Sequence, residues 1–378
     1  MVAIHGRVAE GFEAICEAFE ENFERHGDVG AACCVYLEGE TIVDIWGGVA
    51  DPAAGREWQE ETTQLVFSAT KGATAICVNR LLELGMLELD APVARYWPEF
   101  AAAGKAEIPL RWVLSHRAGL AAVDAELTLD EVLAWDPVVE AIAAQAPNWE
   151  PGTTHGYHAR SYGWILGEVV RRVTGRSIGR YFAEEIADPL GLAFWIGVPE
   201  AELDRCARLI PPTGGSPSVA ELLGSTSLTA RVMSGPSDLF HYDEMWNRAE
   251  VLMAEMPSSN GVCDARALAR MYAATIDELD GVRLLSPETL ATACQEQSKG
   301  PDEVILTPTR FGLGFSLPPM LALGCGDRSF GHPGAGGSLG LADPEARIGF
   351  GYVMNQMLFD PAGDPRSTGL LRALYDCL

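Results

Sequence analysis

The chain has 378 residues, about half of them hydrophobic, and carries 53 acidic against 27 basic side chains for a formal net charge of −26. This length suffices for one large domain or for two closely packed ones. The strong negative charge disfavours nucleic acid and anionic membrane surfaces as partners.

The sequence carries no pattern that indicates export, membrane insertion or disulfide bonding. Acidic residues are spread through the first 25 positions, whereas a secretory signal needs an uninterrupted apolar core. No stretch of 18 uncharged apolar residues occurs that could span a membrane. The nine cysteines are scattered and form no C-x-x-C pair. We therefore expect a cytoplasmic protein with reduced thiols.

The N-terminal part predicts a helix followed by a hairpin. Spacings of three and four predict a helix with one apolar stripe, formed by Val8, Phe12, Ile15, Phe19 and Phe23. After Gly27, the runs GAACCVYL and TIVDIWGG flank the polar turn EGE. Two β-prone runs around a tight turn predict a β-hairpin.

The middle of the chain is predicted to be mostly helical. A helix is expected from Ser68 to about Leu87, with four inward-facing residues: Ile76, Leu81, Leu82 and Leu84. Between residues 90 and 300 the clearest helical pattern is SYGWILGEVVRRVTG, in which Gly175 stands where a C-terminal stop belongs. The run PPTGGSPS at 211–218 is rich in turn residues and predicts a mobile loop.

Strand-like patterns return near the C-terminus, in the runs RFGLGFSL, DRSFGHPG, GSLGLADP and ARIGFGYVMN from residue 310 onward. A closing helix is predicted from Pro365 to Asp376. Because strands occupy both chain ends, the simplest packing is an α+β fold with one antiparallel sheet flanked by helices. We expect residues 1–88 and 300–378 to form this domain, and residues 89–299 to form an inserted, mainly helical domain.

Ser338 lies in a G-x-S-x-G match, GGSLG at 336–340, the pattern of the nucleophile elbow in serine esterases. An elbow serine sits between a strand and a helix, and its acid and histidine partners follow it in the chain. None of the seven histidines lies beyond Ser338, and the residues that follow it predict a turn and a strand. We therefore do not expect Ser338 to be a nucleophile.

Ser68 and Lys71 form an S-x-x-K pair at the start of the predicted helix, a spacing that places both side chains on one helix face. A serine hydroxyl needs a base beside it, and a lysine amine is that base only if its pKa falls. Burial and the positive end of the helix dipole both lower this pKa. The backbone N–H of Ser68 would face a developing oxyanion. The alternative is an N-cap serine followed by a surface lysine.

Four sequence blocks follow one another along the chain: FSATKG, LRWVLSHRAGL, WEPGTTHGYHARSYGWILGEVVRRVTG and FGHPGAGGSLGLADPEARIGFGYVMN. Together they resemble the serine β-lactamase superfamily, class C-like, and within it the family VIII carboxylesterases. The resemblance extends from about residue 10 to about residue 375. It implies a β-lactamase/penicillin-binding-protein-like fold and an acyl-serine hydrolase that needs no cofactor.

The resemblance implies roles for individual residues. Ser68 would be the acylated nucleophile and Lys71 its base. Tyr157 matches the tyrosine that opens the family's second motif and would share proton transfer as a phenolate or as a neutral relay. A neighbouring ammonium lowers the pKa of a phenol, which favours such a shuttle. The alternative for Tyr157 is a core tyrosine that precedes a helix.

The third block would supply the substrate-binding strand. His332 stands where lactamases carry the lysine of K-T-G, and the backbone N–H of Ala335 would complete the oxyanion hole with that of Ser68. Gly334 would let substrate approach the edge strand closely. Trp149 is a further candidate, as part of an acyl pocket.

Two departures from the family pattern favour an ester over a β-lactam. Ala159 replaces the usual asparagine of the second motif, and His332 replaces the lysine of the third. Without these groups, binding of an anionic ring acid should weaken by a few kcal/mol, on the order of one charge-assisted hydrogen bond each. An uncharged ester would lose little. His332 itself would either hydrogen-bond the substrate or act as a base for Ser68, and we favour the first.

The leading hypothesis is thus a serine carboxylesterase that cleaves short-chain, small-molecule esters. The alternatives are a β-lactamase or D,D-peptidase, an acyltransferase on the same scaffold, and an acylated receptor without turnover. A metal site is not expected, since His155 and His158 form an H-x-x-H pair without a third candidate ligand. The sequence does not predict the oligomeric state.

Overall fold

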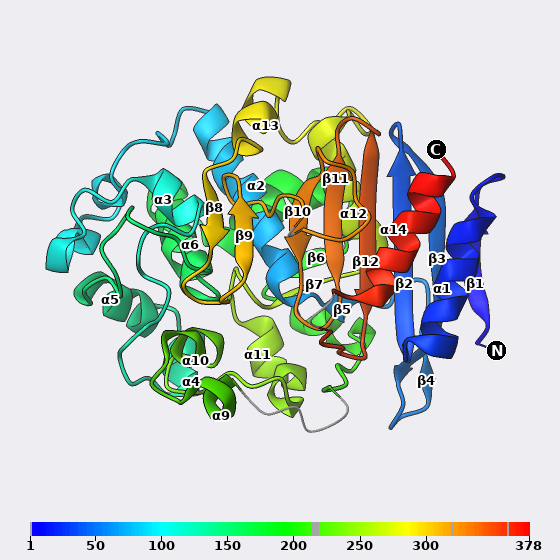
Figure 1. The fold of residues 1–378 in the computed structure, drawn as a ribbon, viewed down its shortest axis with the longest axis horizontal. Helices are drawn as coiled ribbons and strands as arrows, with labels where there is room; N and C mark the ends of the chain where they lie inside the picture. The colour runs from blue at the N-terminus through cyan, green and yellow to red at the C-terminus, as the bar shows by residue number, and fades with distance from the viewer. Residues whose placement is uncertain (1, 213–218, 320, 361–362) are drawn as a thin grey trace.

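A seven-stranded antiparallel sheet dominates the computed structural model of the chain, which describes residues 2–212, 219–319, 321–360 and 363–378 (Figure 1). Its strand order is β1-β3-β2-β12-β11-β10, and β4 pairs with β3. The strands are β1 (Ile4–Val8), β2 (Gly30–Leu37), β3 (Glu40–Asp51), β4 (Arg56–Glu57), β10 (Phe330–Pro333), β11 (Leu339–Asp343) and β12 (Ile348–Met354). The sheet thus combines the two ends of the chain, as the sequence predicts.

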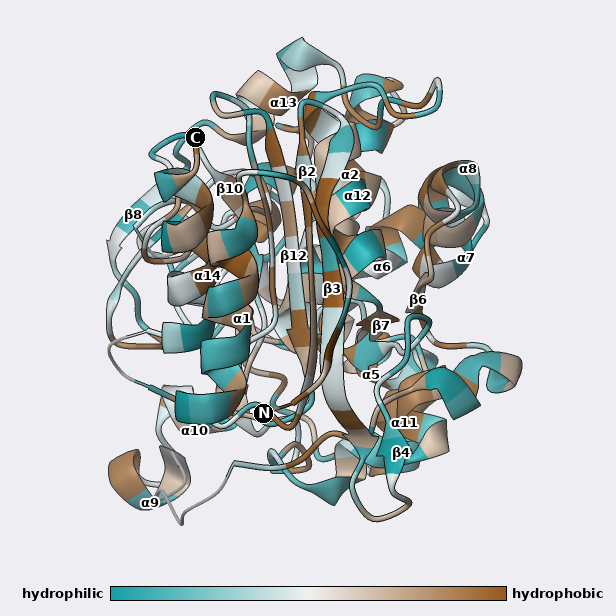
Figure 2. Ribbon diagram, turned by 90° about the vertical axis from the view of Figure 1, so that its right-hand side faces the viewer, coloured by the Kyte–Doolittle hydropathy of each residue, from teal (hydrophilic) through white to brown (hydrophobic). Residues whose placement is uncertain are grey.

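Successive side chains of the central strands point to opposite faces of the sheet, and helices cover both faces. In β2, Ala31, Cys33 and Val35 pack with α1 (Glu13–Arg25) and α14 (Pro365–Asp376). Their neighbours in the strand point to the opposite face, where α12 (Ala265–Ile276) packs against β2, β11 and β12. Figure 2 shows α1 and α14 on one side of the sheet and α12 on the other.

The predicted hairpin is confirmed as β2 and β3. Glu38 and Gly39 form its turn, and both have positive φ, at 52° and 84°. Two successive left-handed residues are typical of a type I′ turn, whose twist matches that of the paired strands.

The segment between the sheet's two halves carries most of the short helices. They are α3 (Leu110–Leu114), α4 (Leu129–Leu133), α5 (Asp136–Ala144), α6 (Ser161–Thr174), α7 (Ile178–Phe182), α8 (Asp188–Leu190), α9 (Val219–Leu223), α10 (Leu228–Met233), α11 (Ala249–Met253) and α13 (Pro287–Ala293). α6 ends at Thr174 and is capped by Gly175, whose φ of 70° is the left-handed conformation that the sequence indicates. The domain boundaries at residues 88 and 300 stay a prediction.

Two small sheets complete the fold and one of them leads into the candidate site. It has the order β5-β7-β6, with β5 (Gln64–Leu65), β6 (Phe194–Ile196) and β7 (Gly261–Cys263). β5 leads through a 3-10 turn, Phe67–Ala69, into the buried helix α2 (Thr70–Glu83). The other small sheet pairs β8 (Ser298–Pro301) with β9 (Pro308–Phe311).

Several details of the sequence prediction are wrong. Val8 belongs to β1, an edge strand that pairs with β3, and not to the first helix, which begins at Glu13. Leu84 follows the end of α2 and is 58% exposed, so it does not face inward. The strand predicted over RFGLGFSL ends at Phe311, because Gly314 adopts a φ of 89° and the chain turns there. Most of the loop predicted at 211–218 lies outside the described residues.

No helix among the described residues is long and apolar enough to cross a membrane.

Candidate active site

Ser68 lies in the 3-10 turn between β5 and α2, held by an unusual backbone conformation at Phe67. Phe67 has a φ of 44°, which is costly for a residue with a bulky side chain. Its ring is buried edge-to-face against Tyr242 and Trp246, with centroids 5.5 and 4.9 Å away, and its carbonyl accepts a hydrogen bond from the Thr70 hydroxyl at 2.6 Å. These contacts offset the strain and fix the turn that presents Ser68.

The side chains of Lys71 and Tyr157 both reach the hydroxyl of Ser68. Lys71 Nζ lies 3.2 Å from Ser68 Oγ, and the Tyr157 hydroxyl lies 2.8 Å from the same oxygen. Lys71 Nζ also lies 4.8 Å from the centre of the Tyr157 ring. The three residues that the sequence singles out for chemistry are therefore in one cluster.

Lys71 is fully buried, and no carboxylate among the described residues acts on its pKa. Its Nζ donates to the backbone carbonyls of Ala159 at 2.7 Å and Ser258 at 3.0 Å. Burial, together with the nearby positive charge of Arg160, holds the pKa of the Lys71 ammonium well below its usual value. A neutral amine has two hydrogens, which the two carbonyls take, so its lone pair is left for the Ser68 hydroxyl.

Burial acts on Tyr157 in the opposite direction. The side chain is 7% exposed, and desolvation raises the pKa of the phenol well above its usual value. Its backbone N–H is anchored by Asp302 Oδ1 at 3.0 Å. Of the two alternatives for Tyr157, this environment favours the neutral relay over the phenolate.

In the described part of the chain, the backbone hydrogen bonds outside regular helices and strands involve the amide of neither Ser68 nor Ala335. Both residues line one cavity of about 30 Å³, together with Tyr157, Phe67, Ala159, Arg160, Met233, Tyr242, Trp246 and Ser259. Gly334 approaches the Ser68 turn so closely that a Cβ there would collide with the carbonyl of Val66. The two amides are therefore candidate donors to an oxyanion formed beside the Ser68 hydroxyl.

His332 is buried in β10, with its ring centre 6.0 Å from that of Tyr157. Its Nδ1 lies 2.7 Å from the carbonyl of Pro333, which can only accept, so Nδ1 carries the proton. Burial lowers the pKa of His332 to about 3, which keeps the ring neutral. Among the described residues no hydrogen bond joins His332 to Ser68, and its Nε2 has no partner. The geometry gives no support to a Ser–His pair.

Trp149 lies outside the cavity at Ser68. Its ring packs against His158, 5.6 Å away at an interplanar angle of 81°, and against the backbone of Gly156. It belongs to a small apolar cluster with Tyr157 and Phe311. A contact with the acyl group therefore stays a prediction.

His155 and His158 do not point at a shared ligand. The Nε2 of His158 accepts from the Leu120 amide at 3.1 Å, and its Nδ1 lies 2.7 Å from the carbonyl of Gly156. His155 Nε2 lies 2.9 Å from the Thr309 hydroxyl. No cluster of three metal-ligating side chains occurs in the described ranges.

Sequence reasoning missed Arg160, which lines the cavity next to Ala159. Its Nη1 donates to the carbonyls of Val232 and Met233, both at 3.0 Å, and its guanidinium lies 4.3 Å from the ring centre of Phe240. Burial lowers its pKa to about 10. The available signal was a charged residue directly after Ala159 of the second motif, but sequence alone does not show that this arginine is buried near Lys71.

Ser338 lies between β10 and β11, an antiparallel pair, and not between a strand and a helix. Its side chain is buried, and its Oγ has no hydrogen-bond partner among the described residues.

Comparison with known proteins gives a family-level match over nearly the whole chain. The sequence model of the Beta-lactamase family matches residues 17–374. The chain is 36% identical over 363 residues to the esterase/beta-lactamase LipL of Mycobacterium tuberculosis, covering 94% of this chain and 83% of LipL. It is 37% identical to a family VIII carboxylesterase of known structure, with a TM-score of 0.92 and full coverage of both chains. A penicillin-binding protein homologue from Caulobacter crescentus has 36% identity and a TM-score of 0.87, again over both full chains.

Proposed function

This chain belongs to the Beta-lactamase family of serine hydrolases, and we propose that it hydrolyses short-chain carboxylic esters through an acyl intermediate on Ser68. The observation that carries the proposal is the convergence of Lys71 Nζ and the Tyr157 hydroxyl on Ser68 Oγ, at 3.2 and 2.8 Å. The names of its esterase relatives support the ester as substrate.

In the proposed mechanism, neutral Lys71 accepts the proton of Ser68 as Oγ attacks the ester carbonyl. The amides of Ser68 and Ala335 stabilise the resulting oxyanion. Tyr157, held neutral by its burial, relays a proton to the departing alcohol. Water then attacks the acyl-serine, and the same groups move the protons in the reverse order.

The size of the cavity favours a short acyl chain. The cavity beside Ser68 has a volume of only about 30 Å³. A larger cavity of about 380 Å³ also reaches Ala335 and is lined by apolar residues that include Leu321, Leu358 and Phe359. We assign the acyl group to the small cavity and the alcohol to the larger one.

The test is hydrolysis of an acetyl and a butyryl aryl ester by the wild type, Ser68→Ala and Ser338→Ala. We expect Ser68→Ala to abolish activity and Ser338→Ala to retain it. Activity that survives Ser68→Ala would exclude the proposal. A clear preference for an octanoyl over an acetyl ester would exclude the assignment of the cavities.

A β-lactam is the second candidate substrate, because LipL carries both activities in its name and one structural relative is a penicillin-binding protein homologue. Ala159 and the neutral His332 offer no charged partner for the ring carboxylate, and Nη1 of the nearby Arg160 is already bonded to the carbonyls of Val232, Met233 and Gly235. We therefore expect slow or no hydrolysis of nitrocefin. Addition of an alcohol acceptor, with analysis of the products, tests transfer in place of hydrolysis. The expectation of a cytoplasmic enzyme stays a prediction.

A further inference from the structure

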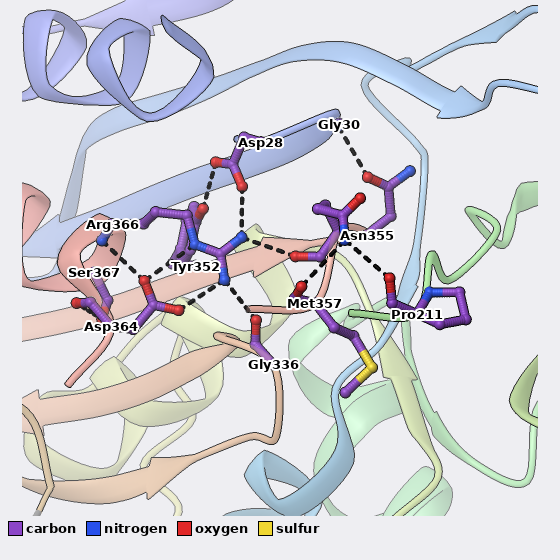
Figure 3. Close-up of polar contacts among 11 residues, drawn as sticks. Asp28, Gly30, Pro211, Gly336, Tyr352, Asn355, Met357, Asp364, Arg366 and Ser367 are labelled. Atoms are coloured by element: carbon purple, nitrogen blue, oxygen red, sulfur yellow. Dashed lines mark hydrogen bonds and ion pairs between the residues drawn. The ribbon is translucent and has the colours of Figure 1, made fainter. Parts of the chain in front are cut away.

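Arg366, the second residue of α14, is fully buried, and all five of its side-chain N–H groups find an acceptor (Figure 3). Nε donates to Asp364 Oδ1 at 3.0 Å. Nη1 donates to Asp28 Oδ1 and to the Gln356 carbonyl, both at 2.8 Å. Nη2 donates to Asp364 Oδ2 at 2.7 Å and to the Gly336 carbonyl at 2.5 Å. Because every N–H group has a hydrogen-bond acceptor, the guanidinium is fixed in one orientation.

The two carboxylates that hold Arg366 come from opposite ends of the chain. Asp28 precedes β2, and its second oxygen accepts from the Tyr352 hydroxyl of β12 at 2.5 Å. Asp364 is the N-cap of α14 and also accepts from the backbone N–H of Arg366. The guanidinium is therefore anchored to the sheet and to the helix at the same time.

The Gly336 carbonyl connects this anchor to the candidate oxyanion hole. It accepts hydrogen bonds from Arg366 and from the Leu358 amide at 3.1 Å, and it follows Ala335 directly in the chain. On the other side of Ala335, the Gly334 amide donates to the Ser338 carbonyl at 2.6 Å. The loop 334–338 is thus held before and after Ala335, while the Ala335 amide is left free.

Close packing leaves this loop little room to shift. Gly336 and Gly337 have φ values of 83° and 131°, which residues other than glycine rarely adopt. A Cβ at Gly336 would lie 2.8 Å from Met357 Cγ, and one at Gly337 would collide with Nη2 of Arg366. The guanidinium therefore sits directly against the backbone of the loop.

We propose that Arg366 is a positioning residue for the reaction, which sets the Gly336 peptide and thereby aims the Ala335 amide at the oxyanion. The inference rests on the acyl-serine function proposed above. An oxyanion donor is effective only when it is held in place before the charge develops. Its displacement lowers kcat and leaves binding of the ester in its ground state largely unchanged.

The test is Arg366→Lys, which keeps the positive charge but cannot reach the carboxylates and Gly336 together. We expect kcat for the acetyl aryl ester to fall by about 10- to 100-fold, with KM changed less than about threefold. Binding of phenylboronic acid, which forms a tetrahedral adduct with an active-site serine, should weaken by a similar factor. All variants are assayed about 15 °C or more below their own Tm, so that each stays folded during the assay. This margin is several times the Tm shift that a change of about 1 kcal/mol in stability causes.

Two further variants keep the test decisive. Arg171→Lys is the control: Arg171 lies in the last turn of α6 and forms an ion pair with the buried carboxylate of Glu168. It should leave kcat unchanged, and an equal loss there would overturn the inference by showing a general effect of destabilisation. Asp28→Asn, at a residue outside the loop 334–338, removes the negative charge that holds Arg366 Nη1 and should lower kcat in the same direction; it decides the question if Arg366→Lys does not fold.

Wild-type kcat and boronate affinity in a folded Arg366→Lys enzyme would overturn the inference, as would a change in KM alone. Ser68→Ala is measured in parallel. If it is inactive while Arg366→Lys retains wild-type kcat, the positioning role fails and the proposed function stands. If Ser68→Ala is active, the proposed function itself fails.

Discussion

Lys71 and Arg366 are both basic residues with fully buried side chains, yet their surroundings are opposite in kind. Arg366 has two carboxylates within 3.0 Å. Lys71 has two backbone carbonyls and the Ser68 hydroxyl. A buried charge with anionic partners stays charged, whereas a buried lysine without them loses its proton easily. The surroundings of Arg366 therefore suit a structural role, and those of Lys71 suit the proton transfer that we propose.

The largest effect is expected from Lys71→Met, which removes the base but keeps the volume of the side chain. Activity on the acetyl ester should fall by about 10²- to 10⁴-fold. Lys105→Met is a matched control, because Lys105 is also fully buried and donates to carbonyls, those of Ala102, Ala143 and Gln145, but has no serine beside it. Retained activity in Lys71→Met, or an equal loss in Lys105→Met, would contradict the role of Lys71.

The stability of the same variant has a predictable pH dependence. Because the pKa of Lys71 is lowered in the folded state, folding below the usual pKa of 10.5 releases a proton. The wild type should therefore lose stability from this group as the pH falls from 10.5 towards the folded pKa. Lys71→Met lacks this loss, so its free energy of unfolding, measured in urea, should fall less steeply over that range.

The next effect concerns the other cation. Arg366→Met leaves Asp28 and Asp364 without their partner, and we expect the free energy of unfolding to fall by about 3–5 kcal/mol. The measurement is urea denaturation at neutral pH, beside Lys71→Met. A loss below about 1 kcal/mol would mean that the network contributes little to the fold.

The smallest effect is expected from Arg160→Gln. Arg160 is the second cause, after burial, of the lowered pKa of Lys71, and the neighbouring Tyr157 and Tyr242 stay neutral. Without that charge the pKa of Lys71 rises, so the alkaline rise of kcat/KM should move to higher pH. Activity at neutral pH should drop less than about tenfold and recover in alkali. Arg117→Gln, which removes an arginine that bonds the Gly152 carbonyl, should leave the profile in place.

Sequence alone predicts the local features of this molecule well. The helix Pro365–Asp376, the stop at Gly175 and the S-x-x-K spacing depend on nearby residues, and the structure confirms these helix limits. β1 was missed because IHGRV is an exposed edge strand with apolar residues only at its ends. The hydrogen bonds to β3 hold this segment in the sheet, although its sequence shows no alternation of apolar and polar residues.

The features that sequence could not predict join distant residues. Asp28 and Arg366 lie 338 positions apart, and nothing in either neighbourhood indicates an ion pair. The carbonyls that bind Lys71 belong to Ala159 and Ser258, whose residue types carry no information about their backbone contacts. The positive φ of Phe67 likewise depends on Tyr242 and Trp246, which the chain reaches much later.

The most direct test of the account is the rate at which an aryl fluorophosphonate labels the enzyme as a function of pH, followed by peptide mapping. We expect the label on Ser68, with a rate that rises as Lys71 loses its proton at a pH well below 10.5. A label on Ser338 or another residue, or a rate that rises only near pH 10.5, would contradict the account.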